Sequence, residues 1–226
     1  MDNVQEVDII TLTTKAQITE TPTPDGAFGM LPVMEAFYTI QGEGFHQGRA
    51  AYFIRLGGCN VGCFWCDVKE SWDADAHPKM SIDNMVKLAA AEPARLAVIT
   101  GGEPLMHQLD HLTTALKQAG FQTNIETSGS YPMSGTWDWI CVSPKKFKSP
   151  TPEALSAANE LKVIIYNKND FEWAEKNAAL VGDHCKLYLQ PEWDKSAVMT
   201  PQIIDYIKAN PRWELSLQIH KYINVP

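Results

Sequence analysis

Long apolar runs, repeats and positive charge are scarce in this chain of 226 residues. No apolar run approaches the ~20 residues of a membrane-spanning helix, so we expect no contact with a membrane. The 19 lysines and arginines are outnumbered by 27 aspartates and glutamates, and the formal charge of −8 argues against binding to nucleic acid. Hydrophobic residues make up 45%, which is typical of a globular protein with its own core.

Cysteine is scarce as well, yet three of the five cysteines lie close together. Cys59, Cys63 and Cys66 have the spacing C-x3-C-x2-C, which lets three thiolates converge on one inorganic centre. Three are too few to close a four-cysteine zinc site or to give every iron of a 4Fe–4S cluster a protein ligand. A cluster on three thiolates therefore leaves one iron open for a small molecule, as catalysis requires.

Other interpretations of the cysteines stay open at this point. A zinc site completed by Cys141, Cys185 or a histidine is one, because short cysteine clusters often bind zinc. Disulfide pairing is disfavoured, since the cysteine count is odd and no signal peptide is visible. Cys141 and Cys185 fall in or beside predicted strands, where we interpret them as small core residues. We expect a cytoplasmic protein with reduced thiols.

Residues 30–226 are predicted to form one domain behind an N-terminal extension at residues 1–29, which is rich in threonine. Apolar stretches along this domain predict strands that alternate with helices. We expect strands at 50–56, 96–100, 121–126, 139–142, 161–166, 186–190 and 215–223, the last of which carries His220. We expect helices at 81–92, 107–119, 170–180 and 200–210.

Polar residues and glycines gather after the carboxyl ends of these strands, in the segments 101–104, 126–129, 143–145 and 190–192. Parallel strands that alternate with helices place such loops at one edge of the sheet, where ligands bind. The predicted helices are too few for eight complete β/α units. The predicted fold is therefore α/β, a partial and open (β/α) barrel with a mainly parallel sheet.

Several single positions are candidates for binding before any family is considered. Arg55 interrupts an apolar strand, so it needs a carboxylate partner from the protein or from a ligand. Gln41 and Glu43 lie in the glycine-rich segment QGEG and offer an amide and a carboxylate to a polar ligand. Glu103, in the segment GGEP, is a candidate acceptor for an ammonium group.

The cysteine motif, the aromatic Trp65 before its third cysteine and the segment GGEP resemble the radical S-adenosylmethionine (SAM) superfamily. QGEG, FIRLGGC, CDVKESW, ITGGEP, IETSG, VSPK and HKYINVP resemble the 7-carboxy-7-deazaguanine synthases in particular, in the same order from about Leu31 to Pro226. The resemblance implies a partial barrel of the radical SAM type. It implies a lyase of queuosine and 7-deazapurine biosynthesis that converts 6-carboxy-5,6,7,8-tetrahydropterin to 7-carboxy-7-deazaguanine with loss of ammonia.

The same resemblance implies the cofactors, the partners and the residues that bind them. Cys59, Cys63 and Cys66 are the implied ligands of a 4Fe–4S cluster, whose open iron SAM chelates. The residues implied for SAM are Trp65, Asp67, Gly102, Glu103, Glu126, Ser143, Pro144, Lys145 and Gln190. The residues implied for the pterin are Ile40, Gln41, Gly42, Glu43, Arg55, Thr100, His220 and Pro226 with its terminal carboxylate. A flavodoxin-type electron donor and a homodimer are further implications.

One position departs from the family pattern. Many members carry a threonine after the Cys-Asp pair, and its hydroxyl helps to bind a Mg2+ ion that also touches the substrate. Val68 stands at that position here and has no side-chain oxygen. Substrate oxygens, water and Asp67 remain as other ligands for Mg2+, which commonly keeps several waters. We therefore predict weak or absent dependence on Mg2+.

Two rival functions fit part of the sequence. A glycyl-radical activating enzyme also uses C-x3-C-x2-C, but it acts on a protein and leaves QGEG, Arg55 and HKYINVP without a role. A zinc-binding interaction protein explains the cysteines alone and predicts a colourless protein whose metal survives air.

Overall fold

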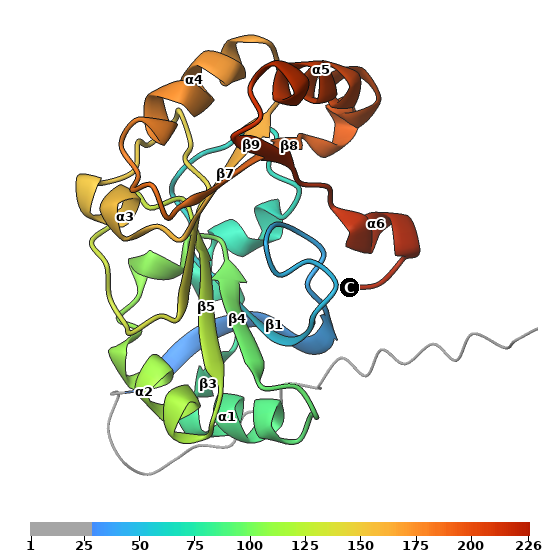
Figure 1. The fold of residues 1–226 in the computed structure, drawn as a ribbon. Coiled ribbons are helices and arrows are strands. Elements are labelled where there is room, and N and C mark those ends of the chain that lie inside the picture. Colours follow the sequence, from blue (N-terminus) through green and yellow to red (C-terminus); the bar gives the residue numbers. More distant parts are fainter. Residues whose placement is uncertain (1–28) are drawn as a thin grey trace, which may run out of the picture.

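The computed structural model describes residues 29–226 as strands and helices that alternate along most of the chain (Figure 1). The strands are β1 (Met30–Ile40), β2 (Ala50–Leu56), β3 (Lys79–Ser81), β4 (Leu96–Gly101), β5 (Gln122–Thr127), β6 (Trp139–Val142), β7 (Glu160–Ile165), β8 (Lys186–Pro191) and β9 (Trp213–Leu215). The α-helices are α1 (Ile82–Ala90), α2 (Asp110–Gln118), α3 (Pro152–Ala157), α4 (Asn169–Ala178), α5 (Ser196–Ala209) and α6 (Ile219–Ile223). Short 3-10 helices are η1 (Lys69–Trp72), η2 (Ala74–Ala76), η3 (Pro104–Met106) and η4 (Trp193–Lys195).

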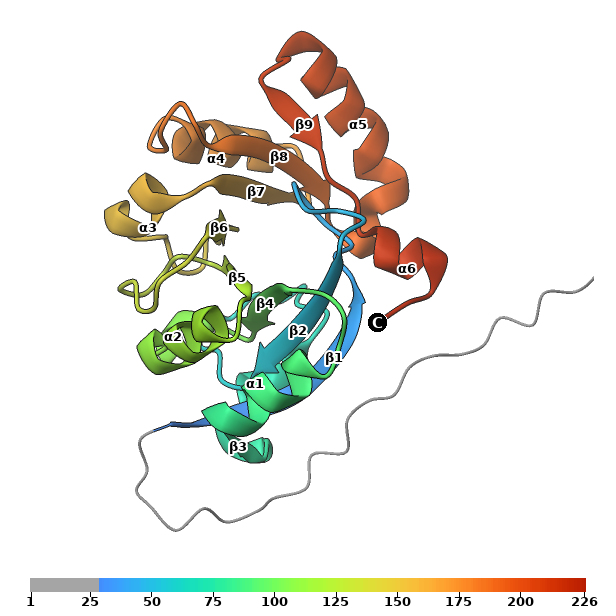
Figure 2. The ribbon, with the colours of Figure 1, turned by 60° about the horizontal axis from the view of Figure 1, so that its bottom comes forward.

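Within the described range the strands form one sheet of nine, in the order β3-β1-β2-β4-β5-β6-β7-β8-β9. All neighbours from β2 to β9 pair in parallel, whereas β1 is antiparallel to both β2 and β3. Figure 2 shows that the sheet curves into an arc that stays open between β1 and β9. Helices α1 to α5 cover its outer face, and α6 lies beside the opening. The predicted partial, open and mainly parallel barrel is confirmed.

The two faces of the sheet differ sharply in polarity, because successive side chains of a strand point to opposite faces. On β7, Leu161, Val163 and Ile165 are fully buried in the outer core beneath the helices. The alternate residues Lys162 and Ile164 line a cavity on the inner face. The outer face thus supplies the hydrophobic stability, and the inner face is left to carry polar side chains.

Capping residues mark the start of α1 and the end of α2. Ser81 caps α1, since its hydroxyl accepts a hydrogen bond from the Asn84 backbone N–H at 3.3 Å. Gly120 follows α2 with φ +83°, a left-handed conformation in which glycine commonly ends helices. Both helices therefore agree with the sequence prediction apart from a later start of α2.

The predicted strand 215–223 is wrong in its greater part. The strand β9 ends at Leu215, and His220 lies on the short helix α6 instead. The backbone N–H of Ser216 still donates to the Leu189 carbonyl at 3.0 Å, but that of Ile219 turns to the Gly42 carbonyl at 3.0 Å. The chain therefore leaves the sheet and folds back over the glycine-rich loop that follows β1.

Three elements were missed or underestimated. The segment from Met30 to Ile40 is a full strand, although a register shift between Val33 and Glu35 interrupts its alternation. The three-residue strand β3 and the helix α3 were not predicted. The helix α3 has clear start signals, since Thr151 caps it and Pro152 occupies its first turn.

No helix within residues 29–226 is long and apolar enough to cross a membrane. The predicted extension at residues 1–29 lies outside the described residues except for Gly29. Its boundary with the domain stays a prediction.

Candidate active site

Two adjoining cavities lie at the carboxyl ends of the parallel strands. The first, which we call the cysteine cavity, has a volume of about 230 Å3 and is lined by Cys59, Cys63 and Cys66. The second, which we call the His220 cavity, has a volume of about 310 Å3 and lies between the ends of β1 and β2 and the helix α6. The residues that line both are Glu43, Arg55, Asp67, Val68, Thr100, Glu126 and Gln218. The two cavities therefore share one wall.

The structure brings most of the predicted site residues to these cavities. In addition to the cysteines, seven of the residues predicted to bind SAM line the cysteine cavity. They are Trp65, Asp67, Gly102, Glu126, Ser143, Lys145 and Gln190. The His220 cavity is lined by every residue predicted for the pterin: Ile40, Gln41, Gly42, Glu43, Arg55, Thr100, His220 and Pro226. The two predicted sets thus fall into two adjoining cavities, and five of their residues line both: Asp67 and Glu126 of the SAM set, and Glu43, Arg55 and Thr100 of the pterin set.

The cysteine loop is fixed by its own backbone. The Gly58 N–H donates to the Ser71 carbonyl at 2.6 Å, and the Cys59 N–H donates to the Trp72 carbonyl at 3.0 Å. A Cβ atom at Gly102 would lie 2.4 Å from the Gly58 oxygen and 2.7 Å from the Cys59 Cβ. Since real Cβ atoms do not approach so closely, only glycine lets the end of β4 pack directly against the cysteine loop.

The donor set of the loop fits a multi-iron cluster. Within the described part of the chain, no three Cys, His, Asp or Glu side chains converge tightly enough to hold a single metal ion. The three thiols are instead arranged around one cavity wall, and a four-iron cluster is wide enough to be held by thiolates that do not meet at a point. Burial raises the pKa of Cys63 to about 11 and also raises that of Cys59, so cluster binding displaces protons from these thiols.

Lys145 is a cation beside the thiols. Its ammonium donates to the Ser143 carbonyl at 2.8 Å and to the Ser143 hydroxyl at 2.6 Å. The same ammonium lies 5.7 Å from the centre of the Trp65 ring. Burial lowers the pKa of Lys145. Its charge offsets the negative charge that thiolates bring to this cavity.

Glu103 and Pro144 are not among the residues that line the cysteine cavity. The Glu103 carboxylate is 1% exposed and accepts from the Leu105 N–H, the Thr127 hydroxyl, and both the N–H and the hydroxyl of Ser128. The expected ammonium acceptor is thus saturated by the protein and caps η3. The Pro144 carbonyl accepts from the Trp173 indole N–H at 3.3 Å. Their assignment to SAM stays a prediction that this geometry does not support.

Arg55 has the carboxylate partner that its place in an apolar strand requires. Its Nε lies 2.6 Å from Glu35 Oε1, and the two residues are paired across β1 and β2. Arg55 also lines both cavities. The inferred partner is therefore a protein carboxylate, which fixes the guanidinium at the shared wall.

A buried lysine that the sequence interpretation missed lies at the same wall. The Lys162 Nζ is 2.5 Å from Glu43 Oε2 and 2.9 Å from Glu126 Oε2. Amides hold the other carboxylate oxygens, since Gln41 donates to Glu126 at 3.2 Å and Gln218 donates to Glu43 at 2.9 Å. We call these five side chains the Lys162 network. A lysine within the apolar strand ELKVII gives the same signal as Arg55 and could have been found in the same way.

The network sets the charge of Glu43. Burial acts to raise the pKa of Glu43, but the Lys162 ammonium and the hydrogen bonds from Lys162 and Gln218 outweigh it and hold the pKa at about 2. Glu43 is therefore an anion at every physiological pH. It is a permanent hydrogen-bond acceptor at the wall between the cavities.

His220 and Pro226 reach the second cavity through a turn. Asn224 adopts φ +55°, and the Val225 N–H donates to the His220 carbonyl at 3.1 Å, which brings Pro226 back to the cavity. A Cβ at Gly42 would lie 2.2 Å from His220 Nδ1, so this glycine allows the ring to lie against the loop. Burial lowers the pKa of His220, although Glu43 acts in the opposite direction.

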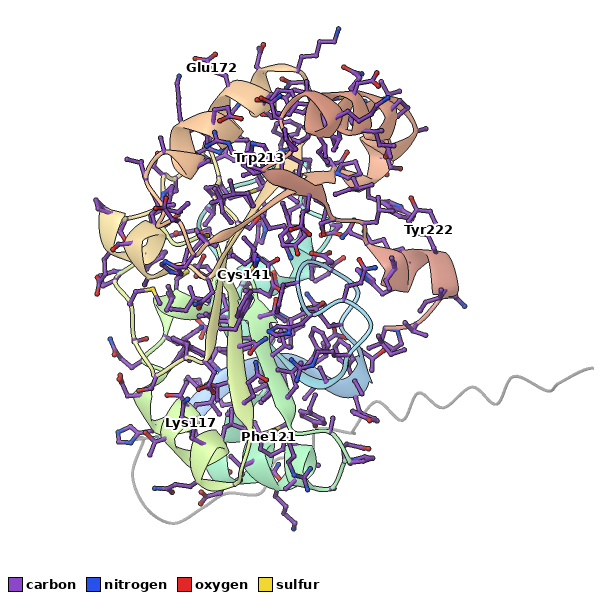
Figure 3. All side chains as sticks on the ribbon, in the orientation of Figure 1. Lys117, Phe121, Cys141, Glu172, Trp213 and Tyr222 are labelled. Atoms are coloured by element: carbon purple, nitrogen blue, oxygen red, sulfur yellow. The ribbon has the colours of Figure 1, made fainter. Side chains whose placement is uncertain are left out.

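Cys141 and Cys185 take no part in either cavity lining. Both are buried, and Figure 3 shows Cys141 near the centre of the molecule, far from the peripheral Glu172. Their interpretation as core residues is supported by this burial.

Comparison with known proteins supplies the family. The model of the radical SAM superfamily matches residues 53–184, more than half of the chain. The chain is 58% identical over 197 residues to the 7-carboxy-7-deazaguanine synthase of Flavobacterium psychrophilum, which covers 87% of this chain and 93% of that protein. It is 47% identical over 194 residues to the synthase of Synechocystis sp., covering 86% of this chain and 93% of that protein.

A solved structure agrees with these sequence matches. The crystal structure of QueE from Escherichia coli aligns with a TM-score of 0.76 at 34% identity, over 83% of this chain and 93% of that chain. The open parallel sheet and the superfamily match define a radical SAM enzyme. Within that superfamily, the chain belongs to the 7-carboxy-7-deazaguanine synthase family. Membership of this family sets aside the zinc-binding protein and the glycyl-radical activating enzyme.

Replacing Gly102 tests the packing of the cysteine loop. In Gly102→Ala the new methyl group collides with the Gly58 oxygen and the Cys59 Cβ, so the loop must move. We expect iron content after anaerobic reconstitution to fall well below the about four irons per chain of a complete cluster. The control is Gly182→Ala, whose methyl group meets only the flexible His184 side chain. Equal iron content in Gly102→Ala and the control would contradict the packing argument.

Proposed function

We propose that this chain catalyses the reaction of its family, the ring contraction of 6-carboxy-5,6,7,8-tetrahydropterin to 7-carboxy-7-deazaguanine with loss of ammonia. The product belongs to queuosine and 7-deazapurine biosynthesis. The observation that carries the proposal is the shared wall between a three-cysteine cavity and a polar cavity lined by all the residues predicted for the pterin. A wall shared in this way supports direct contact between cofactor and substrate.

The residues of the cysteine cavity divide the work of holding the cofactors. Cys59, Cys63 and Cys66 are the proposed ligands of the 4Fe–4S cluster. When bound, the cluster and SAM would supply the radical chemistry that acts on C6 of the pterin. The proposed contacts to SAM in the cysteine cavity are Trp65, Asp67, Gly102, Glu126, Ser143, Lys145 and Gln190. Their part is to fix SAM and to exclude water from the reacting atoms.

The residues of the His220 cavity bind and orient the pterin. The ionised Glu43 accepts from N–H groups of the pterin ring, and the amide of Gln41 offers a second polar contact. Arg55 supplies positive charge for the substrate carboxylate from the shared wall. Holding the two ends of the pterin fixes C6 between them, and such orientation contributes much of the rate of a reaction of this kind.

Three further expectations come from the family. We propose a flavodoxin-type electron donor, a homodimer and a cytoplasmic location. Phe64 of the cysteine loop is 57% exposed, Phe147 beside it is 46% exposed, and the two rings supply an apolar surface near the cluster for a donor.

Turnover of the pterin tests the function. Anaerobically reconstituted protein with SAM and a reductant should convert 6-carboxytetrahydropterin to 7-carboxy-7-deazaguanine, as read by mass spectrometry. Cys59→Ala should lose iron and all turnover, because two thiolates hold the cluster poorly. Cys185→Ala changes a buried core thiol and should retain both the iron and the turnover of wild type. Protein that cleaves SAM but leaves the pterin unchanged would refute the assignment.

Dependence on Mg2+ tests the meaning of Val68. Val68 lines both cavities without an oxygen, and the carboxylate of the alternative ligand Asp67 is already engaged by the Lys221 ammonium at 2.7 Å. We expect removal of Mg2+ to slow turnover less than about 3-fold, since water and substrate oxygens can hold this ion weakly. Val68→Thr restores the hydroxyl and should make turnover more dependent on Mg2+. Complete loss of wild-type turnover on chelation would contradict this.

A further inference from the structure

The Lys162 network places a full positive charge inside the barrel. The Lys162 side chain is 4% exposed, and it projects from the inner face of β7 to carboxylates on two other segments. Glu43 follows β1 and Glu126 belongs to β5, so the ammonium joins three parts of the chain that are distant in sequence. A buried ammonium is costly, and it persists only where anions and hydrogen bonds compensate for the lost hydration.

The groups that face Lys162 keep it charged. Burial acts to lower its pKa, but the facing groups Cys141, Glu126, Glu43 and Glu160 raise the pKa well above its usual value. Burial raises the pKa of Cys141 itself, so that its thiol is neutral and the carboxylates have the main effect. Lys162 is therefore a fixed cation.

The carboxylates that Lys162 joins are the ones that both cavities share. Glu43 and Glu126 each line the cysteine cavity and the His220 cavity. Each has one oxygen bonded to Lys162 and the other to an amide, from Gln218 or Gln41. Because a carboxylate has about four acceptor sites, lone pairs remain on both groups for donors of a ligand.

We propose that Lys162 is a positioning residue, which fixes the carboxylates of Glu43 and Glu126 in one geometry so that the pterin is bound in the correct orientation beside SAM. The inference rests on the proposed function and deepens it. Lys162 acts through the two carboxylates and not by contact with the reacting atoms. Its loss should therefore weaken pterin binding and loosen the coupling between SAM cleavage and product formation.

The effect of removing Lys162 depends on pH in a defined direction. Without the ammonium, burial of Glu43 is opposed by Gln218 and by the half-buried His220, so the pKa of Glu43 rises. Glu126 and Glu160 also face the position of Lys162, and burial raises the pKa of Glu160 to about 7, so protonation of Glu160 acts in the same pH range. A larger fraction of Glu43 is then protonated as the pH falls. Pterin affinity should thus be weakest at low pH and should recover as the pH rises, whereas in the wild type Glu43 stays ionised throughout.

Binding and coupling of variants test this role. The dissociation constants of 6-carboxytetrahydropterin and of SAM are measured by anaerobic calorimetry between pH 6 and pH 8.5, without reductant. Relative to wild type, Lys162→Met should bind the pterin roughly 10- to 100-fold more weakly at the lowest pH, as expected for lost charge-assisted hydrogen bonds, with a smaller loss at the highest pH. SAM affinity should fall less than pterin affinity, because Glu126 is one of seven proposed contacts to SAM, and with reductant more 5′-deoxyadenosine should form per product.

Two further variants separate positioning from simple stability. Lys117→Met removes a partly exposed lysine that pairs with Asp138 outside both cavities and should match wild type at every pH. Lys162→Arg keeps the charge and should restore most of the pterin affinity without the pH dependence. Loss of affinity in Lys162→Met that is equal at all pH values, or unchanged affinity, would overturn the inference.

Glu43→Gln keeps the inference testable even when Lys162→Met does not fold. Its uncharged amide imitates protonated Glu43, so it should bind the pterin weakly at every pH. Wild-type affinity in Glu43→Gln would overturn the role of Lys162. A wild-type chain that neither binds nor converts the pterin would overturn the proposed function and this inference with it. Conversion by wild type together with unchanged binding in Lys162→Met overturns the role of Lys162 alone.

Discussion

Close contact between two backbones positions the cysteine loop. The Gly102 N–H donates to the Leu56 carbonyl at 3.0 Å, and the Glu103 N–H donates to the Gly58 carbonyl at 2.8 Å. These bonds continue the pairing of β2 and β4 beyond the ends of the strands. A Cβ at Gly101 would lie 2.1 Å from the Leu56 oxygen, so two successive glycines are needed for the contact. The pairing of β2 with β4 therefore fixes the position of the cysteines relative to the sheet.

The polar inner face of the sheet follows from the same architecture. Helices cover the outer face, so strand residues that point outward form the hydrophobic cores. Residues that point inward are free to be charged, provided that each finds a partner. Lys162 with Glu43 and Glu126, and Arg55 with Glu35, meet this condition. The protein thus gathers fixed charges around a space in which a polar substrate and a charged cofactor meet.

Local sequence predicted the parts of the site that depend on neighbours along the chain. The cysteine spacing, the glycines of GGEP and the polar residues after each strand are readable because strands that alternate with helices are parallel and share one edge. The single-residue signal of Arg55 also predicted its carboxylate partner. The partner set of Lys162 was not predictable in this way, because Glu43 and Glu126 are 119 and 36 residues distant.

The errors of the sequence analysis have physical causes. Residues 215–223 alternate in polarity like a strand, but contact with Gly42 turns Ile219–Ile223 into a helix of five residues, too short to show a helical period. Glu103 lies in a motif that suggests ligand binding, yet its carboxylate caps η3 and bonds Thr127 and Ser128. A glycine-rich turn shows that backbone approaches something closely. It does not show which way the next side chain points.

The measurement that tests the shared wall most directly is transfer of deuterium from the substrate. The protein would be given SAM, a reductant and 6-carboxytetrahydropterin deuterated at C6, and 5′-deoxyadenosine would be examined by mass spectrometry. Since the two cavities adjoin, the account predicts that deuterium from C6 appears in 5′-deoxyadenosine as the 7-deazaguanine product forms. Formation of 5′-deoxyadenosine without deuterium from the labelled pterin would contradict it.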